Sequence, residues 1–150
     1  MKRRILISIV AIILVAGLGT LFTQLGMKWF DTLNLPSQWI PAFIFPIVWS
    51  VIYLSFGIIL FLWQQNERLN TTTTLLLVIN GVLNVLWCLV FFTLNLTFLG
   101  NVVIVINTIF AYVLTVNIFQ QKKLYGLILS IYPIWLSLAT TLNLAIWILN

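Results

Sequence analysis

Aromatic residues at helical spacing are the feature of this sequence that could perform specific chemistry. Trp49 and Tyr53 are four residues apart, which places both side chains on one face of a helix. They belong to the stretch 35–57 (LPSQWIPAFIFPIVWSVIYLSFG), which also holds three prolines and a second tryptophan. A plain membrane anchor needs only Leu, Ile and Val. This concentration of rings and prolines therefore predicts a shaped site.

A second stripe lies near the end of the chain. Trp135, Ala139 and Asn143 recur at intervals of four, so they share one helical face. The small side chain of Ala139 would let a flat ligand or a neighbouring backbone approach closely. Pro133, just before the stripe, is expected to kink the helix. The tryptophans near the ends of apolar segments are interpreted as interfacial belt residues: Trp29, Trp63 and Trp147.

Amide side chains inside apolar segments form further patterns. Asn80, Asn84 and Cys88 are spaced by four. An amide that faced lipid would cost several kcal/mol, so we expect these asparagines to face other helices or a cavity. Interhelical hydrogen bonding is the favoured interpretation, and lining of a ligand pocket is the alternative.

A third polar pattern repeats by seven residues. Asn101, Thr108 and Thr115 are spaced in this way, as in a seam between two helices. We expect this segment to serve mainly in packing or as a dimer surface.

The chain lacks the residues of most catalytic and metal sites. Asp31 and Glu67 are the only acids, and there is no His. Cys88 is the only cysteine, so a haem could find only this weak candidate for an axial ligand. Paired carboxylates, nucleophilic triads and metal-ligand clusters cannot be assembled. We therefore predict no catalytic residue, no metal and no cofactor, and a metal-free planar aromatic ligand.

Composition places the chain in a membrane. Of its 150 residues 63% are apolar and only 6% are charged, with a mean hydropathy of +1.18. Soluble domains carry about 25% charged residues, so this chain could not cover a water-facing surface. The net charge of +5 does not indicate nucleic acid binding. The basic residues lie at the ends of apolar segments, where they set membrane topology.

A helix that crosses a bilayer needs about 20 mostly apolar residues. Five segments meet this requirement, and they lie at about 5–25, 42–63, 73–93, 97–119 and 125–149. The first also has the pattern of a signal peptide, which we regard as the less favoured alternative. The prediction is an all-α membrane protein, a single domain over residues 1–150 that forms a five-helix transmembrane bundle. The connection 26–41 is the only one long enough to cover a cavity as a lid.

The distribution of basic residues predicts the orientation. Six of the seven basic residues fall on one side of the five predicted segments: Lys2, Arg3, Arg4, Arg68, Lys122 and Lys123. Only Lys28 falls on the other side, where it could pair with a ligand carboxylate. By the positive-inside rule, the N-terminus is cytoplasmic, and the C-terminus and the first loop lie outside the cell membrane.

These residues resemble the translocator protein family (TspO/MBR), also called tryptophan-rich sensory proteins or peripheral-type benzodiazepine receptors, in its bacterial members. The resemblance covers nearly the whole chain. Its loop part consists of Trp29, Phe30, Leu33, Pro36, Trp39 and Pro41. The following helix adds Phe45, Val48, Trp49, Tyr53 and Gly57. The segments LNVLWCLVFF and YPIWLSLATTLNLAIWILN resemble the family's third and fifth helices.

The resemblance implies a membrane bundle, commonly a homodimer, that binds tetrapyrroles such as protoporphyrin IX and isoquinoline or benzodiazepine drugs. It implies a sensor or carrier. The alternatives are a light-dependent porphyrin-degrading enzyme, acting through Trp49 and Trp135, and a small transporter. The residues that match the family's pocket are Trp39, Trp49, Asn84, Trp135 and Ala139. With the neighbouring Tyr53, Trp87 and Asn143, they make up the predicted ligand-binding site.

Overall fold

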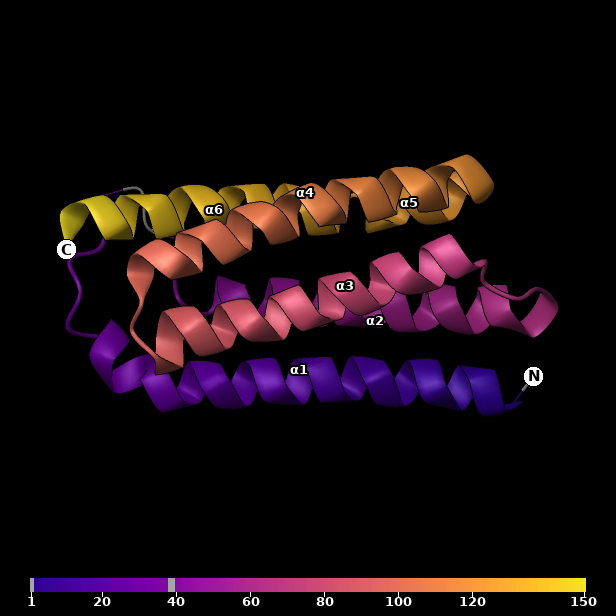
Figure 1. Cartoon of the computed structure of the whole chain (residues 1–150), viewed down its shortest axis with the longest axis horizontal. Helices are drawn as coiled ribbons and strands as arrows, with labels where there is room; N and C mark the ends of the chain where they lie inside the picture. Colours follow the sequence, from indigo (N-terminus) through magenta and orange to yellow (C-terminus); the bar gives the residue numbers. More distant parts are fainter. Residues whose placement is uncertain (1, 38–39) are drawn as a thin grey trace.

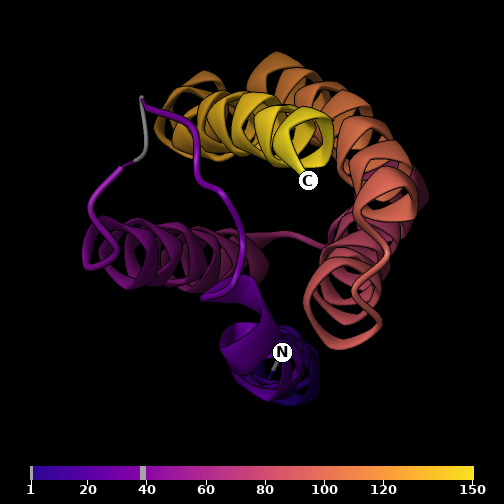
Figure 2. The same ribbon diagram turned by 90° about the vertical axis from the view of Figure 1, so that its left-hand side faces the viewer.

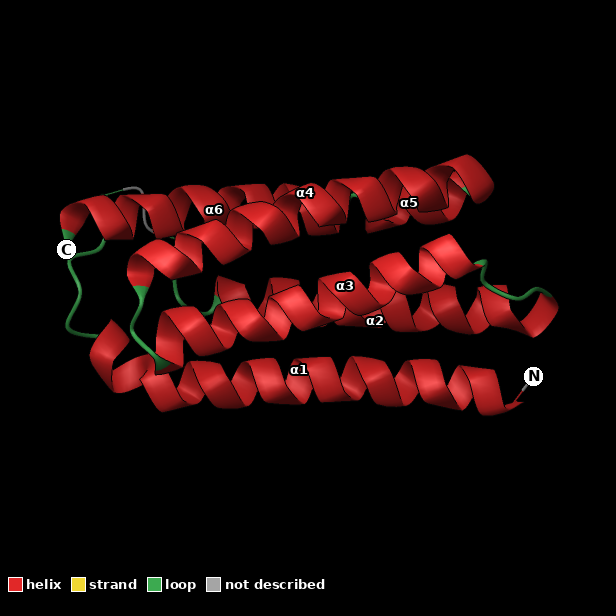
Figure 3. Ribbon diagram, viewed as in Figure 1, coloured by secondary structure: helices red, strands yellow, loops and turns green. Residues whose placement is uncertain are grey.

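Backbone polar groups within a bilayer must be satisfied inside the chain, which favours helices for every apolar segment. A computed structural model describes residues 2–37 and 40–150, and these consist of helices and loops without a strand (Figure 3). The helices are α1 (Lys2–Phe30), α2 (Ile44–Asn66), α3 (Thr71–Cys88), η1 (Leu89–Thr93), α4 (Thr97–Gln121), α5 (Lys123–Leu129) and α6 (Ile131–Leu149) (Figure 1).

Five of the helical units are long and apolar enough to cross a membrane. α3 continues into η1 as one unit, and α5 and α6 together form the fifth, so the units contain 23 to 29 residues. At about 1.5 Å per residue even the shortest exceeds the roughly 30 Å of a bilayer core. The prediction of an all-α, five-helix membrane bundle is confirmed. α1 runs on to Phe30, so the first connection spans 31–43, starting later than the expected lid at 26–41.

The helices form a ring in which α2 makes few contacts with α5 and α6. α1 packs against α2 and α3, α3 packs against α4, and α4 packs against α5 and α6. α2 touches α5 and α6 much less, although these helices are neighbours in the ring (Figure 2). The loop 31–43 and the C-terminus lie at one end of the bundle, and the N-terminus lies at the other (Figure 1). Because α2 and α6 make few contacts, a cavity can form between them.

A close approach between backbones fixes α1 to the end of the third spanning unit. A Cβ atom placed on Gly26 would lie 2.0 Å from the carbonyl oxygen of Phe92, so only glycine fits there. Nearby, the Thr93 hydroxyl donates a hydrogen bond of 2.8 Å to the Phe22 carbonyl. α1 buries few residues elsewhere, so this contact makes a large contribution to its position.

The fifth spanning unit is interrupted near Pro133, the residue at which the sequence analysis expects a kink. Proline has no N–H to donate to the carbonyl of Leu129, and its ring clashes with a regular helix at that position. The interruption falls at Ser130, between α5 and α6. The Ser130 hydroxyl donates to the Leu127 carbonyl at 2.7 Å, and the Ser137 hydroxyl donates to the Pro133 carbonyl at 2.8 Å. The break divides the fifth spanning unit into α5 and α6.

The polar seam of α4 packs within the chain. Thr108 and Thr140 place their hydroxyl oxygens 3.0 Å apart, which joins α4 to α6. Asn101 and Thr115 are 7% and 8% exposed. Of the two roles expected for this seam, it therefore serves packing between helices of one chain.

The tryptophans interpreted as interfacial differ in their surroundings. Trp147 is 42% exposed, as that interpretation requires. Trp63 is only 3% exposed and lies 6.0 Å from the Tyr125 ring, so the interpretation is wrong for Trp63. Trp29 is half-buried and packs edge-on against Phe91 at 5.8 Å. Hydropathy alone does not separate a ring at the membrane surface from one that packs between helices.

Candidate functional site

A cavity of about 480 Å³ lies among α1, α2, α3, η1 and α6, next to the loop 31–43. Its volume falls within the range of roughly 300–1,000 Å³ that is typical of small-molecule sites. Seven of the eight predicted site residues line it: Trp49, Tyr53, Asn84, Trp87, Trp135, Ala139 and Asn143. The eighth, Trp39, lies outside the described residues. The residues chosen from separate sequence segments thus surround one space.

The α2 wall of the cavity is a stack of aromatic rings. Trp49 and Tyr53, one helical turn apart, have ring centroids at 5.6 Å and planes inclined by 26°. Trp49 also faces Trp87 of α3 at 6.4 Å and 30°. Tyr132 of α6 packs against Trp49 at 6.4 Å with its plane at 62°. Flat surfaces in this arrangement favour a planar aromatic ligand.

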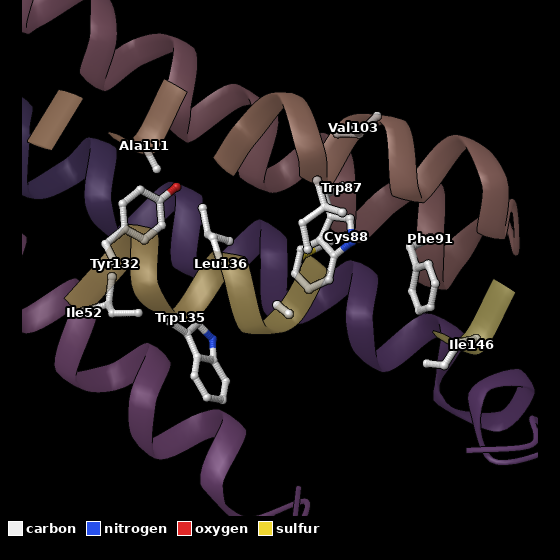
Figure 4. Packing of buried hydrophobic residues seen from close by; sticks show 12 residues of the cluster. Ile52, Trp87, Cys88, Phe91, Val103, Ala111, Tyr132, Trp135, Leu136 and Ile146 are labelled. Carbon is white, nitrogen blue, oxygen red and sulfur yellow. The ribbon is translucent and has the colours of Figure 1, made fainter. Parts of the chain in front are cut away.

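The α6 wall faces α2. Trp135 projects from α6 toward the α2 side of the cavity (Figure 4). It is 7% exposed and packs edge-on against Phe45 of α2 at 5.4 Å. Its Nε1–H is buried and finds no acceptor among the described residues. A ligand with a carbonyl or another acceptor could satisfy this donor.

Asn143 joins the α6 wall to the α3 wall. The Trp87 Nε1–H donates to Asn143 Oδ1 at 3.1 Å, and Asn143 Nδ2 donates to the Ala139 carbonyl at 3.2 Å. Both partners of the first bond are buried, so the bond fixes the orientation of the Trp87 ring. Asn143 therefore positions a ring of the cavity in addition to lining it.

The asparagine stripe of α3 has both of its expected roles, interhelical hydrogen bonding and lining of a pocket. Asn80 donates to the carbonyls of Leu76, at 2.8 Å, and Phe110 of α4, at 3.2 Å, and it joins α3 to α4. Asn84 and Cys88 line the cavity. Interhelical bonding and pocket lining thus both occur along one stripe.

The segment η1 contributes two adjacent rings that the sequence analysis did not assign to the site. η1 is a π-helical turn, in which Leu94 N–H donates to the Leu89 carbonyl at 2.9 Å. Such a turn inserts an extra residue into the helix and shifts the direction of the residues that follow. Phe91 and Phe92 both line the cavity, and Phe91 stacks on Trp87 at 6.3 Å. Hydropathy carries no signal for this change in hydrogen-bond register.

α1 supplies a polar wall of the cavity that the sequence analysis also did not assign to the site. Thr20, Thr23 and Gln24 line the cavity together with Gly19 and Met27. Polar residues spaced by three and four in an otherwise apolar helix are a signal that could have indicated an inward-facing stripe. The aromatic criterion used for α2 and α6 did not select it.

The connection between α1 and α2 contributes Asp31, Leu35 and Ala42 to the lining of the cavity. Asp31 is the only charged residue among the described residues that line the cavity. Lys28 is exposed and lies outside the lining, so the structure gives no support to the expected pairing of Lys28 with a ligand carboxylate. Over residues 2–37 and 40–150, His, Cys, Asp and Glu side chains form no group of three that could hold a metal ion.

A pair of asparagines ties the loop to the end of α6. Asn150 Oδ1 accepts from the Asn34 backbone N–H at 2.9 Å and from Asn34 Nδ2 at 3.4 Å. Asn150 Nδ2 donates to the Asn34 carbonyl at 3.2 Å and to the Ile146 carbonyl at 2.8 Å. We call this the Asn34–Asn150 latch. It joins two segments that both line the cavity, through Leu35 and Ile146.

Comparison with known proteins covers almost the whole chain. The sequence model of the TspO/MBR family matches residues 7–148. The chain is 28% identical to tryptophan-rich protein TspO of Archaeoglobus fulgidus, over 98% of this chain and 97% of the relative. It is 30% identical to protein CrtK of Rhodobacter capsulatus, over 81% and 78%. It is also 30% identical to tryptophan-rich protein TspO of Chlorobaculum tepidum, over 88% and 86%.

Proposed function

Because the chain belongs to the TspO/MBR family of membrane proteins, we propose that it binds a planar tetrapyrrole, of the protoporphyrin IX type, in the cavity between α2 and α6. The observation that carries this proposal is the set of tryptophans around one space of about 480 Å³. Trp49, Trp87 and Trp135 present indole rings to it from three helices. Indole rings stack on flat macrocycles and exclude water from them.

The unpartnered Nε1–H of Trp135 supports the same proposal, because a buried donor without an acceptor costs about 1–3 kcal/mol until a ligand or a water satisfies it. Isoquinoline- and benzodiazepine-type compounds contain flat aromatic rings and nitrogen or carbonyl acceptors, and they are proposed as further ligands. The protein then acts as a sensor or a carrier of the bound molecule. Flux of a porphyrin across proteoliposomes would separate the two roles.

Titration of the purified chain with protoporphyrin IX, followed by the absorbance of the porphyrin, tests the proposal. Saturable binding is expected. Trp49→Ala and Trp135→Ala should each weaken it at least about ten-fold, because each removes a large stacking surface. Trp147→Ala is the matched control, since Trp147 is a half-exposed ring outside the cavity lining. Undiminished affinity in both cavity variants would contradict the proposal.

Light-dependent breakdown of a bound porphyrin is a second candidate, favoured by the aromatic stack Tyr53–Trp49–Trp87. An indole in this stack could give an electron to the excited macrocycle, with dioxygen as the final oxidant. Irradiation of the complex should then yield a new absorbing product. Trp49→Phe or Trp135→Phe should abolish that product. A yield equal to that of free porphyrin in detergent would exclude this activity.

The orientation and oligomeric state complete the proposal. We propose that the N-terminus is cytoplasmic and that the loop 31–43 is outside. Six of the seven basic residues lie on the same side of the five spanning units as the N-terminus, and basic residues are enriched on the cytoplasmic side. We also propose a homodimer. Accessibility of single cysteines to an impermeant thiol reagent in whole cells tests the first proposal, and the mass of the detergent-solubilised particle tests the second.

A further inference from the structure

A second hollow lies at the opposite end of the bundle from the ligand cavity. It is an open groove of about 790 Å³ between the beginning of α1 and the end of α2. Its lining consists of Lys2, Arg3, Ile5, Leu6, Ile9, Phe61, Gln65 and Asn66. None of these residues belongs to the cavity described above.

The groove is polar at one end and apolar further in. α1 and α2 run antiparallel, so Lys2 and Arg3 lie at the same level as the end of α2, where Gln65 and Asn66 stand. Leu6, Ile9 and Phe61 follow deeper in the membrane-spanning part. At about 1.5 Å per residue, Arg3 and Ile9 are separated by roughly 9 Å along the helix axis. This matches the order of headgroup and acyl chain in a phospholipid.

The charges of the groove are of one sign. Lys2 and Arg3 are both exposed, and no acid is among the described residues that line the groove. Glu67, which follows α2, forms an ion pair with Lys122.

The floor of the groove is fixed and apolar. Gln64 Nε2 donates to the Ser8 hydroxyl at 2.7 Å, and this bond holds α1 against α2 beside the groove. Leu6 is 61% exposed and Phe61 is 41% exposed, so apolar surface is available to a chain of CH₂ groups.

We propose that this groove binds an anionic glycerophospholipid. The negatively charged phosphate of such a lipid accepts hydrogen bonds from Lys2 and Arg3, and the amide groups of Gln65 and Asn66 supply neutral donors to the phosphate or the headgroup. One acyl chain lies against Leu6, Ile9 and Phe61. The occupant is a lipid because the apolar floor opens sideways to the bilayer, and a free phosphate ion would leave that floor uncovered.

Native mass spectrometry of the full chain tests this site. The detergent-solubilised protein is mixed with equal amounts of a phosphatidylglycerol and a phosphatidylcholine of the same acyl chains. The wild type should retain phosphatidylglycerol about ten-fold more than phosphatidylcholine, since two basic residues meet a phosphate charge that choline neutralises only in phosphatidylcholine. Lys2→Gln with Arg3→Gln should abolish that preference. Ile9→Trp, which fills the groove and keeps its charges, should reduce retention of both lipids.

The matched control removes two positive charges from the same end of the bundle outside the groove. Arg68→Gln with Lys123→Gln should leave the preference unchanged, because both residues are exposed and neither lines the groove. Equal loss in both double variants would mean diffuse attraction between charges, and it would overturn the proposal. Equal retention of the two lipids by the wild type, or unchanged retention in Ile9→Trp, would overturn it as well.

Discussion

Opening of the Asn34–Asn150 latch should accelerate release of a ligand from the cavity. The latch bridges the loop 31–43 and the end of α6 through three hydrogen bonds. Asn150→Ala removes all three together with the bond to the Ile146 carbonyl. Asn34→Ala removes only the bond that its side chain donates, because its backbone N–H and carbonyl remain. The two variants should therefore differ in severity.

The geometry of these bonds sets the magnitude. Two of them, at 2.9 and 3.2 Å, have good lengths, and the one at 3.4 Å is long and contributes little. A hydrogen bond adds about 0.5–1.5 kcal/mol net, and this site is exposed, so the two together contribute about 1–1.5 kcal/mol. Loss of this energy corresponds to dissociation faster by roughly ten-fold in Asn150→Ala. In Asn34→Ala the increase should stay below about three-fold.

Dissociation is measured by mixing the preformed porphyrin complex with an excess of a porphyrin scavenger in a stopped-flow instrument. Thr32→Ala is the control, because the Thr32 hydroxyl donates to the Trp29 carbonyl within its own turn. Its release rate should equal that of the wild type. A rate within two-fold of the wild type in Asn150→Ala would refute the role of the latch.

Three further predictions concern other parts of the chain. Gly26→Ala should lower the free energy of unfolding of the detergent-solubilised protein by at least about 2 kcal/mol, because the added Cβ would lie 2.0 Å from the Phe92 carbonyl oxygen. Gly17→Ala, which meets no atom within 4 Å, should change stability by less than about 1 kcal/mol, and equal losses in the two variants would contradict the packing described. Asp31→Asn should tighten binding of protoporphyrin IX by about two- to five-fold, because the substitution removes from the cavity lining a negative charge that repels the propionates of the porphyrin. Protoporphyrin IX dimethyl ester, which has no free carboxylate, should bind the wild type and Asp31→Asn equally. Absorbance titrations measure both affinities, and an equal gain for the ester would contradict this explanation. The hydrogen bond from Lys122 lowers the pKa of the Glu67 carboxyl, so this pair stabilises the fold above the ordinary pKa of 4.5, and its contribution disappears as the pH falls through the lowered value. Melting temperatures of the wild type and Lys122→Gln should accordingly differ at pH 7 and converge as the pH is lowered below 4.5, and a constant difference would show that the pair has no such role.

The spanning helices and the aromatic walls of the cavity could be predicted because their signals are local. Trp49 and Tyr53 share a helical face by spacing alone, as do Trp135, Ala139 and Asn143, and all five line one cavity. An apolar run of sufficient length defines a spanning helix without knowledge of its neighbours. The prediction that these two faces meet required the resemblance to a family, since spacing along one helix does not specify which helix lies opposite.

The parts that were missed depend on relations between segments. The π-helical turn at Leu89–Thr93 depends on hydrogen-bond register, which no hydropathy pattern records. The polar wall of α1 has a local signal in the spacing of Thr20, Thr23 and Gln24, but the packing of Gly26 against Phe92, which fixes the position of α1, depends on a distant segment. Trp63 was assigned to the membrane surface from its position near a helix end. Its burial comes from packing against α5, which the sequence does not reveal.

The position of a bound porphyrin tests the central proposal most directly. A structure of the complex with protoporphyrin IX, determined in lipid, should show the macrocycle between α2 and α6 in contact with the rings of Trp49 and Trp135. The Nε1–H of Trp135 should meet an acceptor of the ligand or an ordered water. A macrocycle on the lipid-facing surface or between two copies of the chain, with the cavity left to solvent or lipid, would contradict the account.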